Sequence, residues 1–179
     1  MSGQVVAVSC AAGNVFSKPP QAGISLVAGL GVEGDAHKGK TVQHLYLQRK
    51  DSTAPNLRQV HLVQSELFDE LRQQGFEIGP GNIGENITTR GIDLPALPAG
   101  ARLRIGAACI EITGLRNPCG QLDNFRKGLT KAVTGKNANG KAYLLSAVMG
   151  IVVTGGDIGS GDAIAVEMPE QPYNALQPV

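Results

Sequence analysis

The chain has 179 residues, and its 16 lysines and arginines nearly balance its 15 aspartates and glutamates. A chain of this length buries roughly 70% of its unfolded surface, so it can build a hydrophobic core without disulfides or a structural metal. The even charge balance argues against nucleic acid or an anionic membrane as the main partner. Three irregularly spaced cysteines form no disulfide framework and are typical of a reducing compartment. With no signal peptide and no apolar run of transmembrane length, we expect a cytoplasmic protein.

Short β-branched runs among 24 glycines predict a mainly β, barrel-like fold with a few short helices. The predicted strands are residues 5–8, 60–63, 85–89, 102–105, 109–113, 148–154 and 163–166. Gly106-Ala107-Ala108 predicts a hairpin between the fourth and fifth strands. Residues 155–162 predict a hairpin turn between the last two strands, and without a following Gly-Lys-Ser/Thr they do not form a P-loop.

Two segments have helical periodicity. Residues 65–74 place three apolar side chains on one face behind Ser65 as N-cap, and residues 121–133 repeat apolar side chains at helical spacing, although Gly128 weakens the pattern. Polar residues 38–57 predict a long loop. We expect one domain over residues 1–167 and an extended, partly disordered proline-containing tail over 168–179.

Arg116-Asn117-Pro118-Cys119 is the most informative stretch. Proline and glycine on either side of Cys119 indicate a loop rather than a core strand, and nearby basic residues favour the thiolate. A thiolate can attack an electrophile or bind a metal. The alternative is a buried structural cysteine, which the loop context disfavours.

Three further segments are candidates for the site. Asp35 and His37 could bind a metal, or Asp35 could orient His37 as a general base; an Asx turn beside a surface histidine fits equally well. Arg58 could hold a phosphate or carboxylate, although a lone arginine at a strand end is usually solvated. His61 alternates with apolar neighbours and fits a satisfied histidine on one strand face.

The third segment, Gly84-Glu85-Asn86-Ile87-Thr88, offers amide and backbone donors beside a carboxylate. Its alternative is a turn and the start of a strand.

In this order the segments resemble the MOSC domain, named for the C-terminal domain of molybdenum-cofactor sulfurases and also found as stand-alone bacterial proteins. The resemblance runs from about residue 5 to 166. The motifs that carry it are Gly34-Asp35-Ala36-His37, Arg58-Gln59-Val60-His61, Gly84-Glu85-Asn86-Ile87-Thr88, Gly91-Ile92-Asp93-Leu94, Leu103-Arg104-Ile105-Gly106, Arg116-Asn117-Pro118-Cys119, Gly156-Asp157-Ile158 and Gly161-Asp162.

The resemblance implies a barrel-like fold and a molybdenum cofactor, a pterin that carries a dithiolene and a phosphate. Cys119 would be the metal ligand and catalytic residue. Arg58 and Arg116 would hold the phosphate, and Asp35 and His37 would position the pterin or relay protons. Glu85, Asn86 and Thr88 complete the expected cofactor-binding set, with Asn86 and Thr88 against the pterin.

The resemblance leaves several activities open. We favour reduction of small N-hydroxylated substrates with electrons from a separate protein. The alternatives are a sulfur carrier or sulfurtransferase with a persulfide on Cys119, fed by a sulfur-donor protein, and a non-enzymatic carrier of the cofactor. A last alternative is a metal site built from Asp35, His37 and another histidine.

Overall fold

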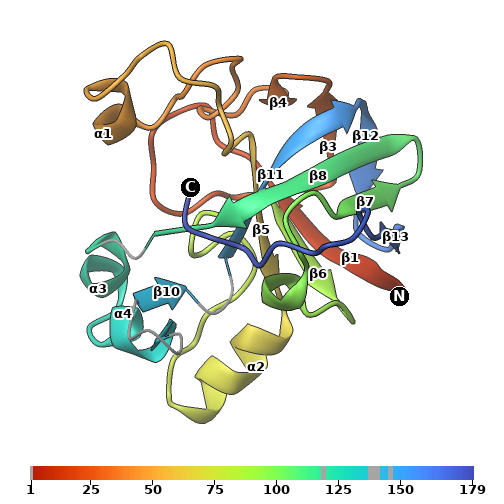
Figure 1. The fold of residues 1–179 in the computed structure, drawn as a ribbon. Coiled ribbons are helices and arrows are strands. Elements are labelled where there is room, and N and C mark those ends of the chain that lie inside the picture. The colour runs from red at the N-terminus through yellow and green to blue at the C-terminus, as the bar shows by residue number, and fades with distance from the viewer. Residues whose placement is uncertain (1, 118–119, 137–141, 145–146) are drawn as a thin grey trace.

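A closed barrel of seven strands dominates the computed structural model, which describes residues 2–117, 120–136, 142–144 and 147–179 (Figure 1). Each strand is hydrogen-bonded to the next, and the last pairs with the first. The order is β1 (Ser2–Ser9), β13 (Ala163–Glu167), β7 (Arg102–Ile105), β8 (Ala108–Leu115), β11 (Ala147–Thr154), β5 (Val60–Gln64) and β6 (Ile87–Arg90). All of these pairs are antiparallel except β5–β6, which is parallel. The mainly β, barrel-like prediction is confirmed.

Alternating apolar residues fill the barrel. In β7, Leu103 and Ile105 are fully buried while Arg102 and Arg104 are exposed, as the two-residue period of a strand requires. Leu62 and Ile164 belong to the same core cluster. The barrel is therefore packed with side chains, and the space for a ligand must lie outside this core.

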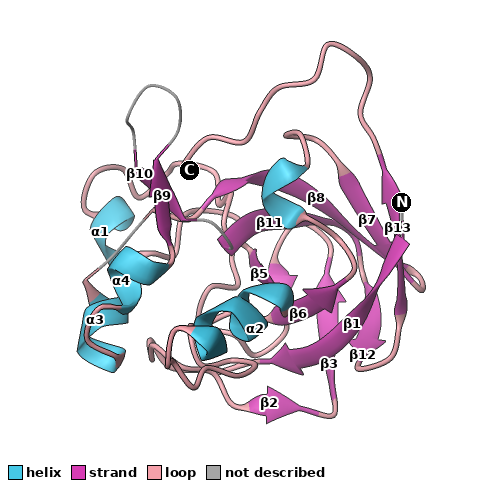
Figure 2. Cartoon of the chain, turned by 90° about the horizontal axis from the view of Figure 1, so that it is seen from below, coloured by secondary structure: helices cyan, strands magenta, loops and turns pink. Residues whose placement is uncertain are grey.

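Smaller sheets flank the barrel (Figure 2). β12 (Gly156–Gly159), β3 (Gly23–Val27) and β4 (Gly31–Val32) form a three-stranded sheet, and β2 (Pro20–Gln21) extends the edge of β1. β9 (Thr134–Lys136) pairs with β10 (Ala142–Leu144).

One of the two hairpin predictions is confirmed and the other is wrong. β7 and β8 form the expected hairpin, with Ile105 opposite Ala108. β11 and β13 do not pair with each other: β11 lies between β8 and β5, and β13 lies between β7 and β1. The glycine-rich connection between them contains β12, which leaves the barrel to pair with β3. Glycines at four of its eight positions hid this short strand in the sequence.

The helices are short. α2 (Glu66–Gln73) buries Leu67, Phe68 and Leu71 as expected, although no side-chain hydrogen bond caps it at Ser65. The segment predicted as one helix divides into α3 (Gln121–Phe125) and α4 (Leu129–Ala132) because Gly128 has φ +86°. α1 (Leu45–Gln48) lies within the predicted loop, and the 3₁₀ helix η1 is Leu94–Ala96. No helix in the described ranges is long and apolar enough to cross a bilayer.

The C-terminal segment packs on the barrel. Ala175 bridges to Pro98, Pro178 bridges to Leu115, and Leu176 is only 7% exposed. The backbone of Leu115 donates to Gln177 O and accepts from the Val179 N–H. These contacts hold the C-terminal segment against the barrel.

Candidate functional site

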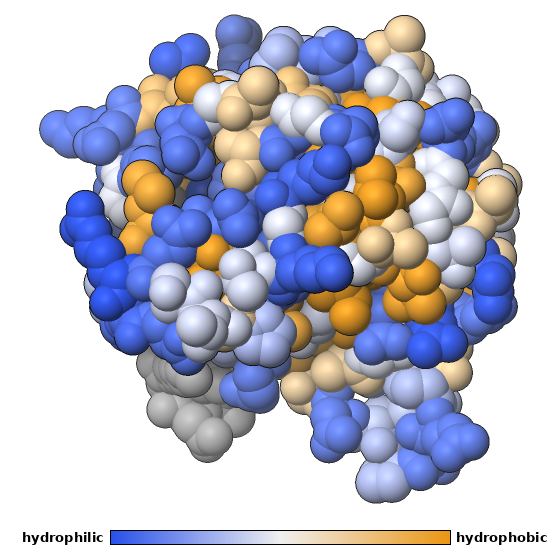
Figure 3. Space-filling model, turned by 90° about the horizontal axis from the view of Figure 1, so that it is seen from above, coloured by the Kyte–Doolittle hydropathy of each residue, from blue (hydrophilic) through white to orange (hydrophobic). Residues whose placement is uncertain are grey.

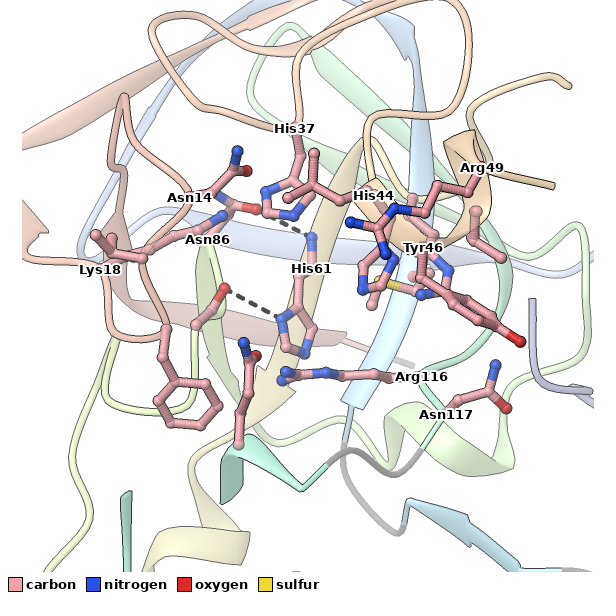
Figure 4. A pocket seen from close by; sticks show the side chains of 18 of the residues that line it. Asn14, Lys18, His37, His44, Tyr46, Arg49, His61, Asn86, Arg116 and Asn117 are labelled. Atoms are coloured by element: carbon pink, nitrogen blue, oxygen red, sulfur yellow. Dashed lines mark hydrogen bonds between the residues drawn. The ribbon is translucent and has the colours of Figure 1, made fainter. Parts of the chain in front are cut away.

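A pocket of about 770 Å³ opens between the barrel and α1 (Figure 4). Its walls come from segments far apart in the sequence: the loop after β1, the region from His37 to Arg58, the ends of β5 and β11, the turn before β6 and the segment after β8. The lining residues are Asn14, Val15, Phe16, Lys18, His37, His44, Leu45, Tyr46, Leu47, Arg49, Lys50, Arg58, His61, Gly84, Asn86, Arg116, Asn117, Gln121 and Met149.

The pocket mouth combines apolar and basic side chains. Val15, Leu45 and Tyr46 line it and are more than half exposed. Lys50 Nζ lies 4.6 Å from the centre of the Tyr46 ring, a cation–π contact. Figure 3 shows the face on the α1 and β4 side, where apolar residues lie among polar ones. The entrance can therefore contact both apolar and anionic parts of a ligand.

The lining is electropositive. It includes five basic residues, Lys18, Arg49, Lys50, Arg58 and Arg116, and no aspartate or glutamate belongs to the described lining. A concave surface with cations and no carboxylate attracts and holds anions. The pocket therefore suits a negatively charged ligand.

Arg58 and Arg116 form the centre of this positive region. Arg116 is held by a 2.7 Å hydrogen bond from its Nη1 to Ile83 O and lies 5.9 Å from the Phe16 ring. Arg58 has a buried Nε with no hydrogen-bond partner. Burial and, next, the charge of Arg116 lower the pKa of Arg58. A guanidinium whose charge is disfavoured by burial and by a neighbouring cation is stabilised when an anion binds beside it.

A buried carboxylate, Asp35, organises the pocket floor. It accepts hydrogen bonds from Lys18 Nζ at 2.9–3.0 Å, from Asn86 Nδ2 at 2.9 Å and from the His37 backbone at 3.0 Å. His37 Nδ1 lies 3.2 Å from its Oδ1, and the Ala11 backbone N–H lies 3.4 Å from its Oδ2. Asp35 therefore ties the loop after β1, the His37 loop and the turn before β6 into one unit.

The electrostatics of this unit favour ionised Asp35. Burial alone would raise its pKa, but hydrogen bonds from His37 and the charge of Lys18 outweigh burial and hold the pKa far below its usual range. Lys18 is 4% exposed, and burial lowers its pKa while Asp35 opposes that change. Its charge is thus already compensated, unlike that of Arg58.

His61 and His44 add two further imidazoles. His61, on β5, is 7% exposed, and its Nδ1 lies 3.2 Å from Gly84 O. Burial, then the charges of Arg116 and Lys18, hold its pKa well below the usual value. Partial burial and the charge of Arg58 also lower the pKa of His44. Both rings are therefore neutral near pH 7.

Four predicted site residues line this pocket: His37, Arg58, Asn86 and Arg116. Asp35 lies directly behind them, bonded to His37 and Asn86. The side-chain amide of Asn86 is already engaged, since Nδ2 donates to Ser9 O and Asp35, and Oδ1 accepts from the His61 backbone. Asn86 is therefore part of the floor.

Glu85 and Thr88 do not line the pocket. Glu85 Oε1 accepts from the Gly81 backbone at 2.6 Å and from Thr88 Oγ1 at 3.0 Å, so both side chains brace the turn before β6. Burial raises the pKa of Glu85. Cys119 lies outside the described residues; in the sequence it falls between Asn117 and Gln121, both of which line the pocket.

A metal site of Asp35, His37 and another histidine gains no support. All three histidines line one pocket, yet no group of three or more His, Cys, Asp or Glu side chains in the described ranges could hold a metal ion.

Several pocket residues were missed from the sequence, among them Lys18, His44 and Phe16. Lys18 stands in a Ser-Lys-Pro-Pro stretch with no local signal, because its partner Asp35 is 17 residues away. His44 lies in the polar segment that predicted only a long loop. The presence of His44, Tyr46, Arg49 and Lys50 together in that segment was the available signal.

Solved structures support the fold. The chain is similar to the crystal structure of YuaD from Bacillus subtilis, with a TM-score of 0.76 and 22% identity over 95% of this chain and 98% of that one. It is also similar to YiiM from Geobacillus stearothermophilus (TM-score 0.65, 19% identity, 92% of this chain and 75% of that one) and from Escherichia coli (0.60, 17%, 98% and 74%).

The sequence itself identifies the family. No curated protein matches it significantly by sequence. The family model of the MOSC domain matches residues 49–165, which is more than half of the chain. The match begins after the Asp35–His37 loop. The chain belongs to the MOSC domain family.

Proposed function

We propose that the pocket binds a molybdenum cofactor and that the protein reduces small N-hydroxylated substrates with electrons from a separate protein. The observation that carries the proposal is the set of five basic residues around the pocket, with no carboxylate among the lining residues that the structure describes. The association of the MOSC family with the molybdenum cofactor supports it.

The described residues fit such a group. A volume of about 770 Å³ lies within the range of small-molecule and cofactor sites, about 300–1,000 Å³. The buried Nε of Arg58 lacks an acceptor, which a phosphate oxygen supplies. Arg58 and Arg116 would hold the phosphate, and Cys119 would bind the metal as its thiolate.

The reduction needs protons as well as electrons. An N-hydroxylated amine takes up two electrons and two protons, the N–O bond breaks, and an amine and water leave. When bound, the cofactor supplies the redox chemistry that side chains lack. His37 is suited to deliver a proton, because Asp35 binds its Nδ1 and leaves Nε2 for a ligand in the pocket.

The decisive experiment is elemental and pterin analysis of protein purified from a host that makes the cofactor. We expect near-equal amounts of molybdenum and pterin, and less bound metal in Cys119→Ala, because alanine cannot replace a thiolate ligand. Cys109→Ala is the matched control, since Cys109 is buried in β8. Full metal occupancy in Cys119→Ala would remove Cys119 from the ligand set.

The same protein preparation distinguishes a reductase from a sulfur carrier. A reductase turns over a hydroxylamine with an artificial electron donor only when the cofactor is bound. A sulfur carrier instead gains one sulfur atom on Cys119 after incubation with a cysteine desulfurase, and a reductant removes it. Cys10 should stay unmodified, because burial and the charge of Asp35 raise its thiol pKa. If the protein contains neither molybdenum nor pterin and forms a persulfide on Cys119, the sulfur-carrier function replaces the proposed reductase function.

A further inference from the structure

Among the described residues of the pocket wall, two polar side-chain atoms are buried without a hydrogen-bond partner: Nε of Arg58 and Nε2 of His61. Buried polar groups in native proteins are normally paired, because an unpaired one loses its hydration without compensation. An unpaired donor and an unpaired acceptor in one pocket indicate that a ligand completes them.

His61 Nε2 is an acceptor by elimination. Nδ1 lies 3.2 Å from Gly84 O, and a carbonyl oxygen only accepts, so Nδ1 carries the hydrogen. The ring is neutral near pH 7, since burial and the charge of Arg116 hold its pKa well below the usual value. In a neutral imidazole with Nδ1 protonated, Nε2 keeps its lone pair.

This acceptor lies among donors. Arg58, His61 and Arg116 all line this pocket, and the charge of Arg116 lowers the pKa of both His61 and Arg58. Figure 4 shows the Arg116 guanidinium beside the edge of the His61 ring that carries Nε2. A fully deprotonated oxyanion would satisfy the guanidiniums and leave Nε2 unpaired.

We propose that Arg58, Arg116 and His61 form a subsite for a tetrahedral oxyanion that carries a proton, such as a hydrogen phosphate. The phosphate O–H donates to His61 Nε2, and its other oxygens accept from the guanidiniums. Because Nε2 is buried in this structure, the side chains that cover it must move aside when the oxyanion binds. The inference rests on the proposed function only in taking the cofactor's phosphate monoester, in its singly protonated form, as the natural occupant.

Phosphate and sulfate test the subsite directly, because sulfate has the same shape but no O–H near pH 7. The full chain is purified from a host that cannot make the cofactor, and each ion is titrated in a calorimeter at pH 7. One hydrogen bond to a charged group separates the two ions, so phosphate should bind roughly tenfold to hundredfold more tightly. His61→Phe should abolish this preference, and His61→Gln, whose side-chain oxygen can accept, should retain part of it.

Equal affinities in the unsubstituted protein, or no binding of either ion, overturn the subsite without any variant, so a misfolded His61→Phe does not leave the question open. A preference that persists in folded His61→Phe also overturns it. Cofactor analysis stays separate: a phosphate preference in a protein that never acquires molybdenum or pterin contradicts the proposed function and leaves the subsite standing. Bound cofactor without a phosphate preference supports the proposed function and contradicts the subsite.

Discussion

Arg58 differs from an ordinary surface arginine in having a buried Nε without a partner, and burial and then the charge of Arg116 lower its pKa. Arg58→Lys keeps the charge but loses the planar fork that binds two oxygens at once. We expect cofactor affinity to fall roughly tenfold to hundredfold, the effect of one charge-assisted hydrogen bond. Cofactor retention during dialysis measures it.

Arg72→Lys is the matched control for this substitution. Arg72 is 64% exposed on α2, where it pairs with Asp69, and it does not line the pocket. Equal cofactor loss in the two variants would show that Arg58 is not a dedicated phosphate clamp, and the backbone N–H groups of the glycine-rich turns would then be the better candidates.

Asp35 differs from Arg58 because its charge is already compensated by its partners in the pocket floor. Asp35→Asn leaves the Lys18 ammonium buried without its counter-charge, and breaking a buried ion pair in this way costs about 3–5 kcal/mol. Urea unfolding at pH 7 measures the loss. Asp35→Asn/Lys18→Met removes both charges, so we expect it to recover part of the stability. Recovery of nothing would mean that the hydrogen bonds of Asp35, rather than its pairing with Lys18, provide the stabilisation.

The same carboxylate sets an acid dependence. Its pKa is lower in the folded than in the unfolded protein, so the unfolded chain binds more protons between the two values. The stabilisation is present above the unfolded pKa, about 4 for aspartate, and is lost as the pH falls toward the folded value. Between pH 5 and 3 the unsubstituted protein should therefore lose stability more steeply than Asp35→Asn. Parallel slopes in urea unfolding would contradict this. His61 is present in both proteins, so its own titration cancels in the comparison.

At the scale of elements, the C-terminal segment packs against β8, and each stabilises the other. A Cβ on Gly114 would lie 2.4 Å from Gln177 O and 2.5 Å from Val179 Cγ1. Gly114→Ala must therefore displace the segment, and we expect a loss of about 1–3 kcal/mol, as for overpacked sites. Thermal or urea unfolding measures it.

Removal of residues 174–179 is the control for the Gly114 substitution. Without the segment the methyl group meets neither atom, so Gly114→Ala should cost much less in the shortened chain than in the full one. An equal cost in both chains would place the strain within β8. The backbone of Leu115 donates one hydrogen bond to this segment and accepts another, and Leu115 directly precedes Arg116. The two measurements therefore also test how firmly the backbone next to the pocket arginine is held.

At the scale of the molecule, the sequence predicted the barrel strands because each has a recognisable pattern within its own segment. The alternation in β7 and the two-residue turn to β8 are local features. β12 and β3 were not predicted, since glycines interrupt one and the two are paired across more than a hundred residues. Arg58, His37 and Arg116 were predicted as site residues from their motifs. Lys18 and His44 were missed, because only the folded chain brings them to the pocket.

Barrel closure has a consequence for the order of events during synthesis. β1 pairs with β13, with Ser2 opposite Ala165. The first strand therefore cannot complete its pairing until one of the last strands has been synthesised. Pairings this distant in sequence make a fold slow to form, because a long loop must close before they stabilise it. The pocket draws residues from Asn14 to Met149, so a ribosome must release most of the chain before an anion can be captured. The proposed cofactor can therefore be captured only after β11 has been synthesised.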